Sequence, residues 1–178
     1  VATKRRKTPI GTLPLLRYQI IPAKGATRRR GLAACYCSGM DIIKTLQETL
    51  GADQVITGEE ISRRATSYWD QAPTTALALL KPRNTEEVSA ALKVCHAHKQ
   101  PVVTQGGLSG CVEGAVAAEN EVIISLEKMN RIESIDPQDG VAFVEAGVIL
   151  EVLQEKVQEH ELIFPLDLGA RGSCTIGG

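Results

Sequence analysis

The stretch that decides the fold is PVVTQGGLSGCVEGAV, residues 101–116. Three β-forming residues lead into four closely spaced glycines, which are Gly106, Gly107, Gly110 and Gly114. Glycine adopts positive φ without penalty and lets another molecule approach the main chain closely. Successive N–H groups in such a loop form an anion-binding nest, for which a diphosphate is the obvious ligand and Ser109 a further donor. The alternative is a turn whose glycines serve tight packing only, and spacing alone leaves both interpretations open.

The spacing excludes two familiar nucleotide-binding motifs. The P-loop pattern G-x-x-x-x-G-K-[ST] requires a Lys that does not follow here. A Rossmann dinucleotide site requires G-x-G-x-x-G at the start of a helix, and that pattern is absent as well. A second segment rich in small residues lies further along the chain, at FPLDLGARGSCTIGG (164–178). Two such segments could hold one extended ligand from two sides.

The residues before the glycines predict a βαβ unit. TTALALLKP (74–82) reads as an apolar strand that a proline ends, and VVTQ (102–105) as the next strand. Between them Asn84 caps a helix, with Glu87 at its N3 position. The predicted apolar stripe of this helix consists of Val88, Ala91, Leu92 and Cys95. The glycines then follow the carboxyl end of the second strand, and the crossover is expected to be right-handed.

The remaining sequence predicts four further kinds of element. Two short helices are expected at 41–50 and 59–68, and a buried strand at 121–126. Residues 131–147 read as a hairpin whose turn lies between Pro137 and Gly140. Residues 149–162 form an amphipathic helix with Leu150, Leu153 and Val157 facing inward.

Composition bounds the class of protein. Hydrophobic residues make up 43% of the 178 residues and aromatic residues only 3%, which predicts an aliphatic core. So few aromatic rings argue against a surface that stacks single-stranded nucleic acid. Nine of the 20 Lys and Arg residues precede Asp41, the first acidic residue, so the body that follows is acidic and a poor DNA binder. No run of about 18 apolar residues is present, so no transmembrane segment is expected.

The basic N-terminal stretch, residues 1–40, is expected to be a disordered leader. Three interpretations stay open: a mitochondrial transit peptide, a basic arm that touches RNA or anionic lipid, or sequence upstream of a natural start at Met40. The body is expected in the cytoplasm, with the periphery of the inner membrane as an alternative. If residues 1–39 are a transit peptide, the location is mitochondrial.

Cysteine and histidine spacing predicts no metal site. The five cysteines, an odd number without a C-x-x-C pair, indicate free thiols in a reducing compartment. CHAH (95–98) would place His96 and His98 on different faces of a helix, so that they could not bind one ion together.

Three motifs carry a family resemblance. They are KPRNTEEVSAALKVCHAHKQPVVTQGGLSGCVEGAV (81–116), SLEKMNRIESIDPQDGVAFVEAGVILEVLQE (125–155) and FPLDLGARGSCTIGG (164–178). In this order they resemble the FAD-binding domain of the vanillyl-alcohol oxidase / p-cresol methylhydroxylase (PCMH) type. Within it they are most similar to the flavin-dependent D-2-hydroxy-acid dehydrogenases, and PLDLGARGSC leans toward D-2-hydroxyglutarate dehydrogenase. The resemblance covers roughly residues 66–178.

The resemblance implies an α+β fold, namely a βαβ-containing subdomain followed by a mixed sheet, incomplete at the C-terminus. Residues 41–71 would be an N-terminal helical segment, and 72–178 the N-terminal part of the FAD-binding domain. The implied FAD-binding residues are Gln105, Gly106, Gly107, Leu108, Ser109, Gly110, Ala115, Pro165, Gly169, Gly172, Ser173, Ile176 and Gly177. Glycine would be needed at 106–110 because a Cβ atom would hold the phosphates off. Arg171 would help to neutralise the cofactor or would pair with an acid.

The resemblance also indicates the chemistry. Relatives that bind FAD covalently often place a His where this chain has Leu108, so FAD is expected to be noncovalent. A 2-hydroxy acid such as D-lactate, glycolate or D-2-hydroxyglutarate would be oxidised to the 2-oxo acid, bound through a C-terminal substrate domain outside these residues. The catalytic residues and the electron acceptor stay unassigned, and a homodimer stays open. The alternatives are a flavin oxidase of the same fold with an alcohol or sugar substrate, and a remnant of the fold without activity.

Overall fold

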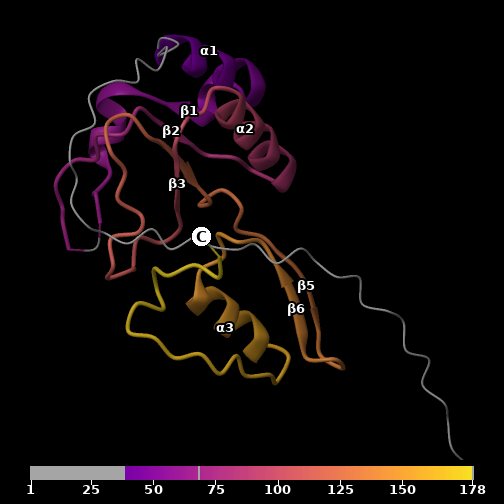
Figure 1. Cartoon of the computed structure of the whole chain (residues 1–178). Helices are drawn as coiled ribbons and strands as arrows, with labels where there is room; N and C mark the ends of the chain where they lie inside the picture. Colours follow the sequence, from indigo (N-terminus) through magenta and orange to yellow (C-terminus); the bar gives the residue numbers. More distant parts are fainter. Residues whose placement is uncertain (1–38, 68, 178) are drawn as a thin grey trace, which may run out of the picture. The chain divides into compact units, whose positions relative to one another are not determined.

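The computed structural model describes residues 39–67 and 69–177, and these belong to one structural unit (Figure 1). Residues 1–38 of the predicted leader, including Cys35 and Cys37, lie outside the described residues. Its last two residues, Gly39 and Met40, were expected to be disordered but form the start of the first helix. The helices are α1 (Gly39–Leu50), α2 (Thr85–Ala97) and α3 (Leu150–Gln158), with 3₁₀ turns η1 (Ala52–Gln54) and η2 (Gly58–Arg63). The strands are β1 (Val55–Ile56), β2 (Ala78–Leu80), β3 (Val102–Gln105), β4 (Val122–Ser125), β5 (Ile132–Asp136) and β6 (Val141–Val144).

The main sheet has four strands in the order β1-β2-β4-β3. Strands β2, β4 and β3 are parallel, and β1 pairs antiparallel with β2 at one edge. The predicted βαβ unit is present, but β4 lies between β2 and β3, so the two strands of the unit are not neighbours. Strands β2 and β4 are buried along their whole length, which explains their unbroken runs of aliphatic residues.

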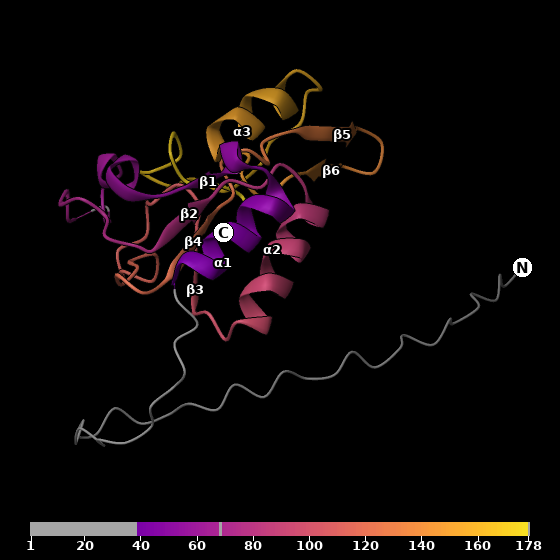
Figure 2. The same cartoon turned by 90° about the horizontal axis from the view of Figure 1, so that it is seen from above.

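Each face of this sheet has its own apolar core. Alternate residues of a strand point to opposite faces. Leu80 and Ile124 face the helices α1 and α2, which lie side by side in both views (Figures 1 and 2). Leu79 and Ile123 face the other side, where Ile61 of η2 packs against them. The segment before β2 thus contributes to both cores, through α1 on one face and η2 on the other.

Helix α2 begins as predicted. The Asn84 side chain accepts a hydrogen bond of 2.8 Å from the Glu87 N–H. The Glu87 carboxylate accepts one of 2.7 Å from the N–H of Arg83, one residue before the cap. The prediction of the apolar stripe is partly wrong. Ala91 and Cys95 are buried as predicted, but Leu92 is exposed. Val94 packs against the core instead, so the buried face is rotated from the predicted one.

The sequence between α1 and β2 differs most from the prediction. A helix was expected at 59–68, but only the short 3₁₀ turn η2 forms, and β1 lies in a stretch that was expected to be a connection. Gly51 (φ 99°), directly after α1, and Gly58 (φ 67°), at the start of η2, adopt backbone conformations with positive φ that favour glycine. The pairing of Val55 with Leu80 then fixes this segment to the sheet edge.

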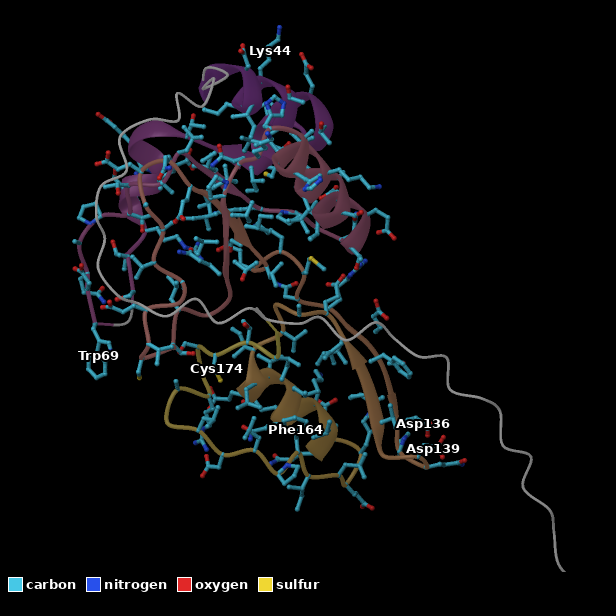
Figure 3. The ribbon with its side chains drawn as sticks, in the orientation of Figure 1. Lys44, Trp69, Asp136, Asp139, Phe164 and Cys174 are labelled. Carbon is cyan, nitrogen blue, oxygen red and sulfur yellow. The ribbon has the colours of Figure 1, made fainter. Side chains whose placement is uncertain are left out.

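The C-terminal part contains the predicted hairpin and helix. Gly140 (φ 64°) closes the turn between β5 and β6. Helix α3 packs on the hairpin through Leu153 and Val157, and Phe164 lies against it (Figure 3). Leu150, Leu153 and Val157 are all buried, as predicted. The helix ends at Gln158 rather than 162, since Glu161 adopts a φ of 59°. No helix within residues 39–67 and 69–177 is long and apolar enough to cross a membrane.

Candidate functional site

The carboxyl ends of the parallel strands gather the candidate site. The chain leaves β2 at Lys81, β3 at Gly106 and β4 at Leu126, and the Leu126 N–H donates to the Gln105 carbonyl at 3.0 Å. Ligands of open sheets with parallel strands bind at this edge. A cavity of about 600 Å³, the larger cavity, opens here beside the glycine loop, residues 106–114.

The glycine loop exposes its main chain. Among the described residues, none accepts a hydrogen bond from the N–H groups of residues 107–115. Leu108 (φ 52°) and Glu113 (φ 57°) adopt the left-handed conformation, which is uncommon outside glycine and clusters at functional sites. A Cβ at Gly110 or Gly114 would meet open space. These free donors fit a bound anion.

Gly107 has a different role from the one predicted. A Cβ at this position would collide with the main-chain carbonyl of Ser173, which belongs to the C-terminal loop, residues 165–177. The expectation that every glycine in 106–110 is needed to admit phosphates is therefore wrong for Gly107, because the neighbouring loop fills that space. Glycine at 107 lets the two loops touch.

Gln105 holds the base of the glycine loop. Its side chain is fully buried, and its Nε2 donates to the carbonyl of Ala115 at 2.8 Å, across the loop. Its Oε1 has no hydrogen-bond partner among the described residues. Gln105, predicted to bind the cofactor, does not line the cavities beside the loop, so its contribution is to fix the loop ends.

The C-terminal loop is fastened to the start of α3. The N–H groups of Leu150 and Glu151 donate at 3.0 Å to the carbonyls of Cys174 and Arg171. Cys174 lies beside the start of this helix (Figure 3). Of the two roles considered for Arg171, the structure shows pairing with acids, at 3.3 Å from Glu151 and 3.7 Å from Asp167. The N-terminus of α3 thus uses these donors within the protein.

A second cavity of about 390 Å³, the smaller cavity, also borders the glycine loop. Gly106, Gly107 and Leu108 line both cavities. Of the other predicted residues, Ser109, Gly110 and Ala115 line the smaller cavity and Ser173 the larger. The remaining predicted residues lie outside both: Pro165, Gly169, Gly172, Gly177, and Ile176, which lines an apolar pocket beside the hairpin.

Several lining residues were not predicted from the sequence. Thr175 lines both cavities, and Arg63, Arg64 and Glu127 line the larger one. Arg64 Nη1 lies 2.7 Å and Lys81 Nζ 2.8 Å from the Glu127 carboxylate. The sequence signal for two of these residues was a charged side chain close behind an apolar strand. Lys81 follows β2 directly, and Glu127 lies two residues after β4. Arg64 had no comparable signal because it lies in the segment whose structure was predicted wrongly.

The acidity of Glu127 follows from these contacts. Partial burial by itself raises the pKa of this carboxyl group. Hydrogen bonds from Arg64 and Lys81, together with their positive charges, outweigh burial and lower the pKa to about 2. Glu127 is therefore ionised at neutral pH, and this cluster of two cations and one anion is net positive.

The residues fit the FAD that the resemblance implies. FAD is long and carries a diphosphate near its middle, and here a loop of free N–H donors lines two cavities. The acidic side chain of Glu113 is exposed and lines neither cavity, so it does not oppose an anion there. Residues 107–110 would hold the diphosphate, and Ser173 and Thr175 would contact the remainder of the cofactor.

Comparison with known proteins identifies the family. The model of the FAD binding domain matches residues 76–178. The mitochondrial D-2-hydroxyglutarate dehydrogenase of Arabidopsis thaliana is 40% identical over 137 residues, 76% of this chain and 24% of that protein. A mitochondrial Schizosaccharomyces pombe protein that bears the name D-lactate dehydrogenase is 46% identical over 99 residues, 56% of this chain and 19% of that protein.

A solved structure supports the same family. Substrate-bound p-cresol methylhydroxylase superposes with a TM-score of 0.62 at 26% identity, over 78% of this chain and 28% of that one. The chain spans about a quarter of the length of the curated relatives that it matches. The matched residues and the mixed α/β fold show that this chain belongs to the PCMH-type family of FAD-binding domains.

Proposed function

We propose that this chain is the FAD-binding part of a dehydrogenase that oxidises a D-2-hydroxy acid to the 2-oxo acid. The observation that carries the proposal is the identity to D-2-hydroxyglutarate dehydrogenases, 40% for the plant protein and 38% for the Xanthomonas citri protein. D-2-Hydroxyglutarate is accordingly the first substrate to test, and D-lactate, from the name of the yeast relative, is the second.

The residues of this chain bind and orient the cofactor in this proposal. The N–H groups of the glycine loop hold the diphosphate, and Gln105 fixes the loop ends. The contact of Gly107 with the Ser173 carbonyl keeps the two loops together around the cofactor. The bound FAD would supply the hydride acceptor for the oxidation at Cα of the substrate. We assign the base that takes the hydroxyl proton to the part of the protein that lies beyond this chain.

The test uses the full-length protein, purified with its flavin and mixed anaerobically with one substrate at a time. D-2-Hydroxyglutarate, D-lactate and glycolate are compared, with L-2-hydroxyglutarate as the matched control. The expected result is loss of the oxidised-flavin absorption with one D-acid and not with the L-acid. Bleaching by an alcohol or sugar alone would favour the other oxidases of this fold. A folded protein that stays colourless with excess FAD would contradict a flavin enzyme altogether.

We further propose that the cofactor is noncovalent, because Leu108 stands where covalent relatives often carry a His. Leu108 offers no nucleophile, and Ser109 and Gly110 offer no imidazole beside it. Acid precipitation is expected to leave a yellow supernatant and a white pellet. A yellow pellet after washing would contradict this proposal.

The relatives from Arabidopsis thaliana and Schizosaccharomyces pombe are described as mitochondrial, which supports the transit-peptide interpretation of residues 1–39. We propose this location for the protein. A fusion of residues 1–40 to a fluorescent protein is expected to reach mitochondria, and a version with the arginines of this segment changed to glutamine is not. Cytoplasmic fluorescence from the unaltered fusion would refute the location.

A further inference from the structure

One wall of the larger cavity comes from a segment outside the matched family domain. The domain match begins at residue 76, whereas Arg63, Arg64 and Ala65 line this cavity. The segment is anchored on its apolar side by Ile61, which is buried in the core beneath the sheet. Residues 63–65 can form a wall of the cavity only if polar contacts also hold them against the matched domain.

Arg64 supplies the polar link between this segment and the end of β4. Its Nη1 lies 2.7 Å from Glu127 Oε2, and its Nη2 donates to Ser125 Oγ at 3.3 Å. Ser125 Oγ also lies within hydrogen-bond distance of Glu127 Oε2, at 3.1 Å, so the three side chains form one network. The Arg64 side chain retains only 17% exposure in this position. Hydrogen bonds to an ionised, partly buried group are stronger than neutral ones and define geometry.

Two details indicate a role beyond fold stability. Arg64 Nε is buried and has no acceptor among the described residues, which is a cost that native structures tend to keep at functional positions. Glu127 keeps a second partner in Lys81, at 2.8 Å. Loss of Arg64 would therefore not leave the Glu127 carboxylate unpaired, and the sheet end would stay charge-compensated.

We propose that Arg64 is a positioning residue for the cofactor, which holds residues 62–65 as a wall of the larger cavity through Glu127 and Ser125. The inference rests on the assignment of this cavity to FAD. The wall extends the cofactor site beyond the matched domain, so residues 76–178 alone would form an incomplete site. Without the Arg64 side chain, residues 62–65 would keep the Ile61 anchor and the main-chain hydrogen bond from the Thr74 N–H to the Arg64 carbonyl, at 3.0 Å, but would lose their link to the end of β4.

The experiment measures the dissociation constant of FAD for the full-length apo-protein, by titration with FAD and recovery of the bound-flavin spectrum. Arg64→Met is expected to raise this constant about tenfold, the size of one lost charge-assisted hydrogen bond. The unfolding temperature of the apo-protein is recorded in parallel, because a residue that serves the fold alone would lower that temperature without changing the dissociation constant of FAD.

Variants of two other arginines distinguish the positioning effect of Arg64 from the loss of a positive charge. Arg83→Met removes one cation and one ion pair, with Asp53, away from both cavities, and sets the baseline for the unfolding temperature of the apo-protein. Arg63→Met removes a cation from the rim of the same cavity without breaking the link to Glu127. The loss of FAD affinity for Arg64→Met is expected to exceed that for Arg63→Met. The Arg64→Met apo-protein is expected to unfold at a lower temperature than Arg83→Met, because its lost ion pair with Glu127 is the less exposed of the two.

A double-mutant cycle tests the route through Glu127. If Arg64 acts through this carboxylate, Arg64→Met combined with Glu127→Gln lowers FAD affinity no further than the more damaging single change. Additive losses would overturn the inference, as would equal losses for Arg63→Met and Arg64→Met, or wild-type affinity in Arg64→Met. If the wild-type protein itself bound no FAD, the cofactor assignment and this inference would fall together.

Discussion

At the scale of single residues, the site depends on which neighbour each glycine meets. Gly107 meets the Ser173 carbonyl, and Gly147 would place a Cβ against the carbonyl of Leu126. Gly110 meets nothing and does not need a left-handed backbone. Substitution by alanine is therefore expected to have different effects at these glycines, although they look alike in the sequence.

Gly107→Ala is expected to destabilise the protein by about 1–3 kcal/mol, the usual effect of overpacking, because the Ser173 main chain must move. Gly110→Ala is the matched change and should leave the free energy of unfolding near that of wild type. Its methyl group would instead enter the space of the ligand and weaken FAD binding. Denaturant unfolding and FAD titration of both variants check this. Equal stability of the two would contradict the close contact at Gly107.

Gln105→Leu is expected to lower FAD affinity by about five- to tenfold, since the loop ends lose the hydrogen bond that joins them. Gln100 offers the control, because its Nε2 donates to the Asn120 carbonyl at 2.6 Å, at the opposite end of β3. Gln100→Leu should leave FAD affinity unchanged. The two dissociation constants are measured by flavin titration, and an equal loss in both variants would argue against a specific role for Gln105.

At the scale of elements, the sequence predicted structure well wherever the interactions that define an element join residues close together in the chain. The Asn84 cap, the Gly140 turn and the inward face of α3 all followed from a few neighbouring residues. Strand β1 could not be predicted in this way. It is two residues long and exists because Val55 and Ile56 pair with a distant strand, whose influence is absent from local sequence.

Asn84→Ala should destabilise the protein by about 1 kcal/mol, because the first turn of α2 loses the acceptor for the Glu87 N–H. Asn84→Asp keeps an acceptor at this position and should stay close to wild type. Thermal unfolding of both variants is the measurement. A loss of the same size in Asn84→Asp would indicate that the amide, and not capping, is what matters.

At the scale of the whole molecule, the three motifs predicted the family. The residues that line the site could be predicted only in part. The glycine loop and Ser173 lie together as expected. Arg64 and Lys81 come to Glu127 from segments far apart in the sequence. Side chains that meet only after folding leave no fixed spacing in the sequence, and this explains why the cluster was missed.

The Glu127 cluster makes the stability of the molecule depend on pH. The pKa of Glu127 is lowered from its ordinary value of 4.5, which holds in the unfolded chain, to about 2 in the folded chain. The stabilisation is therefore complete above the unfolded pKa and is lost as the pH falls toward 2. Glu127→Gln should lose less unfolding free energy than wild type between pH 6 and pH 3. Denaturant unfolding at both pH values tests this, and parallel losses in the two proteins would contradict it.

The contact between Gly107 and the Ser173 carbonyl has a mechanical consequence. Two segments that touch main chain to main chain, without a side chain between them, have no soft layer to absorb a displacement. Movement of the C-terminal loop must therefore push directly on the glycine loop, which we propose to hold the diphosphate. A bound nucleotide would in turn stiffen the C-terminal loop, residues 165–177. Entry and exit of the cofactor would then require both segments to shift as one body.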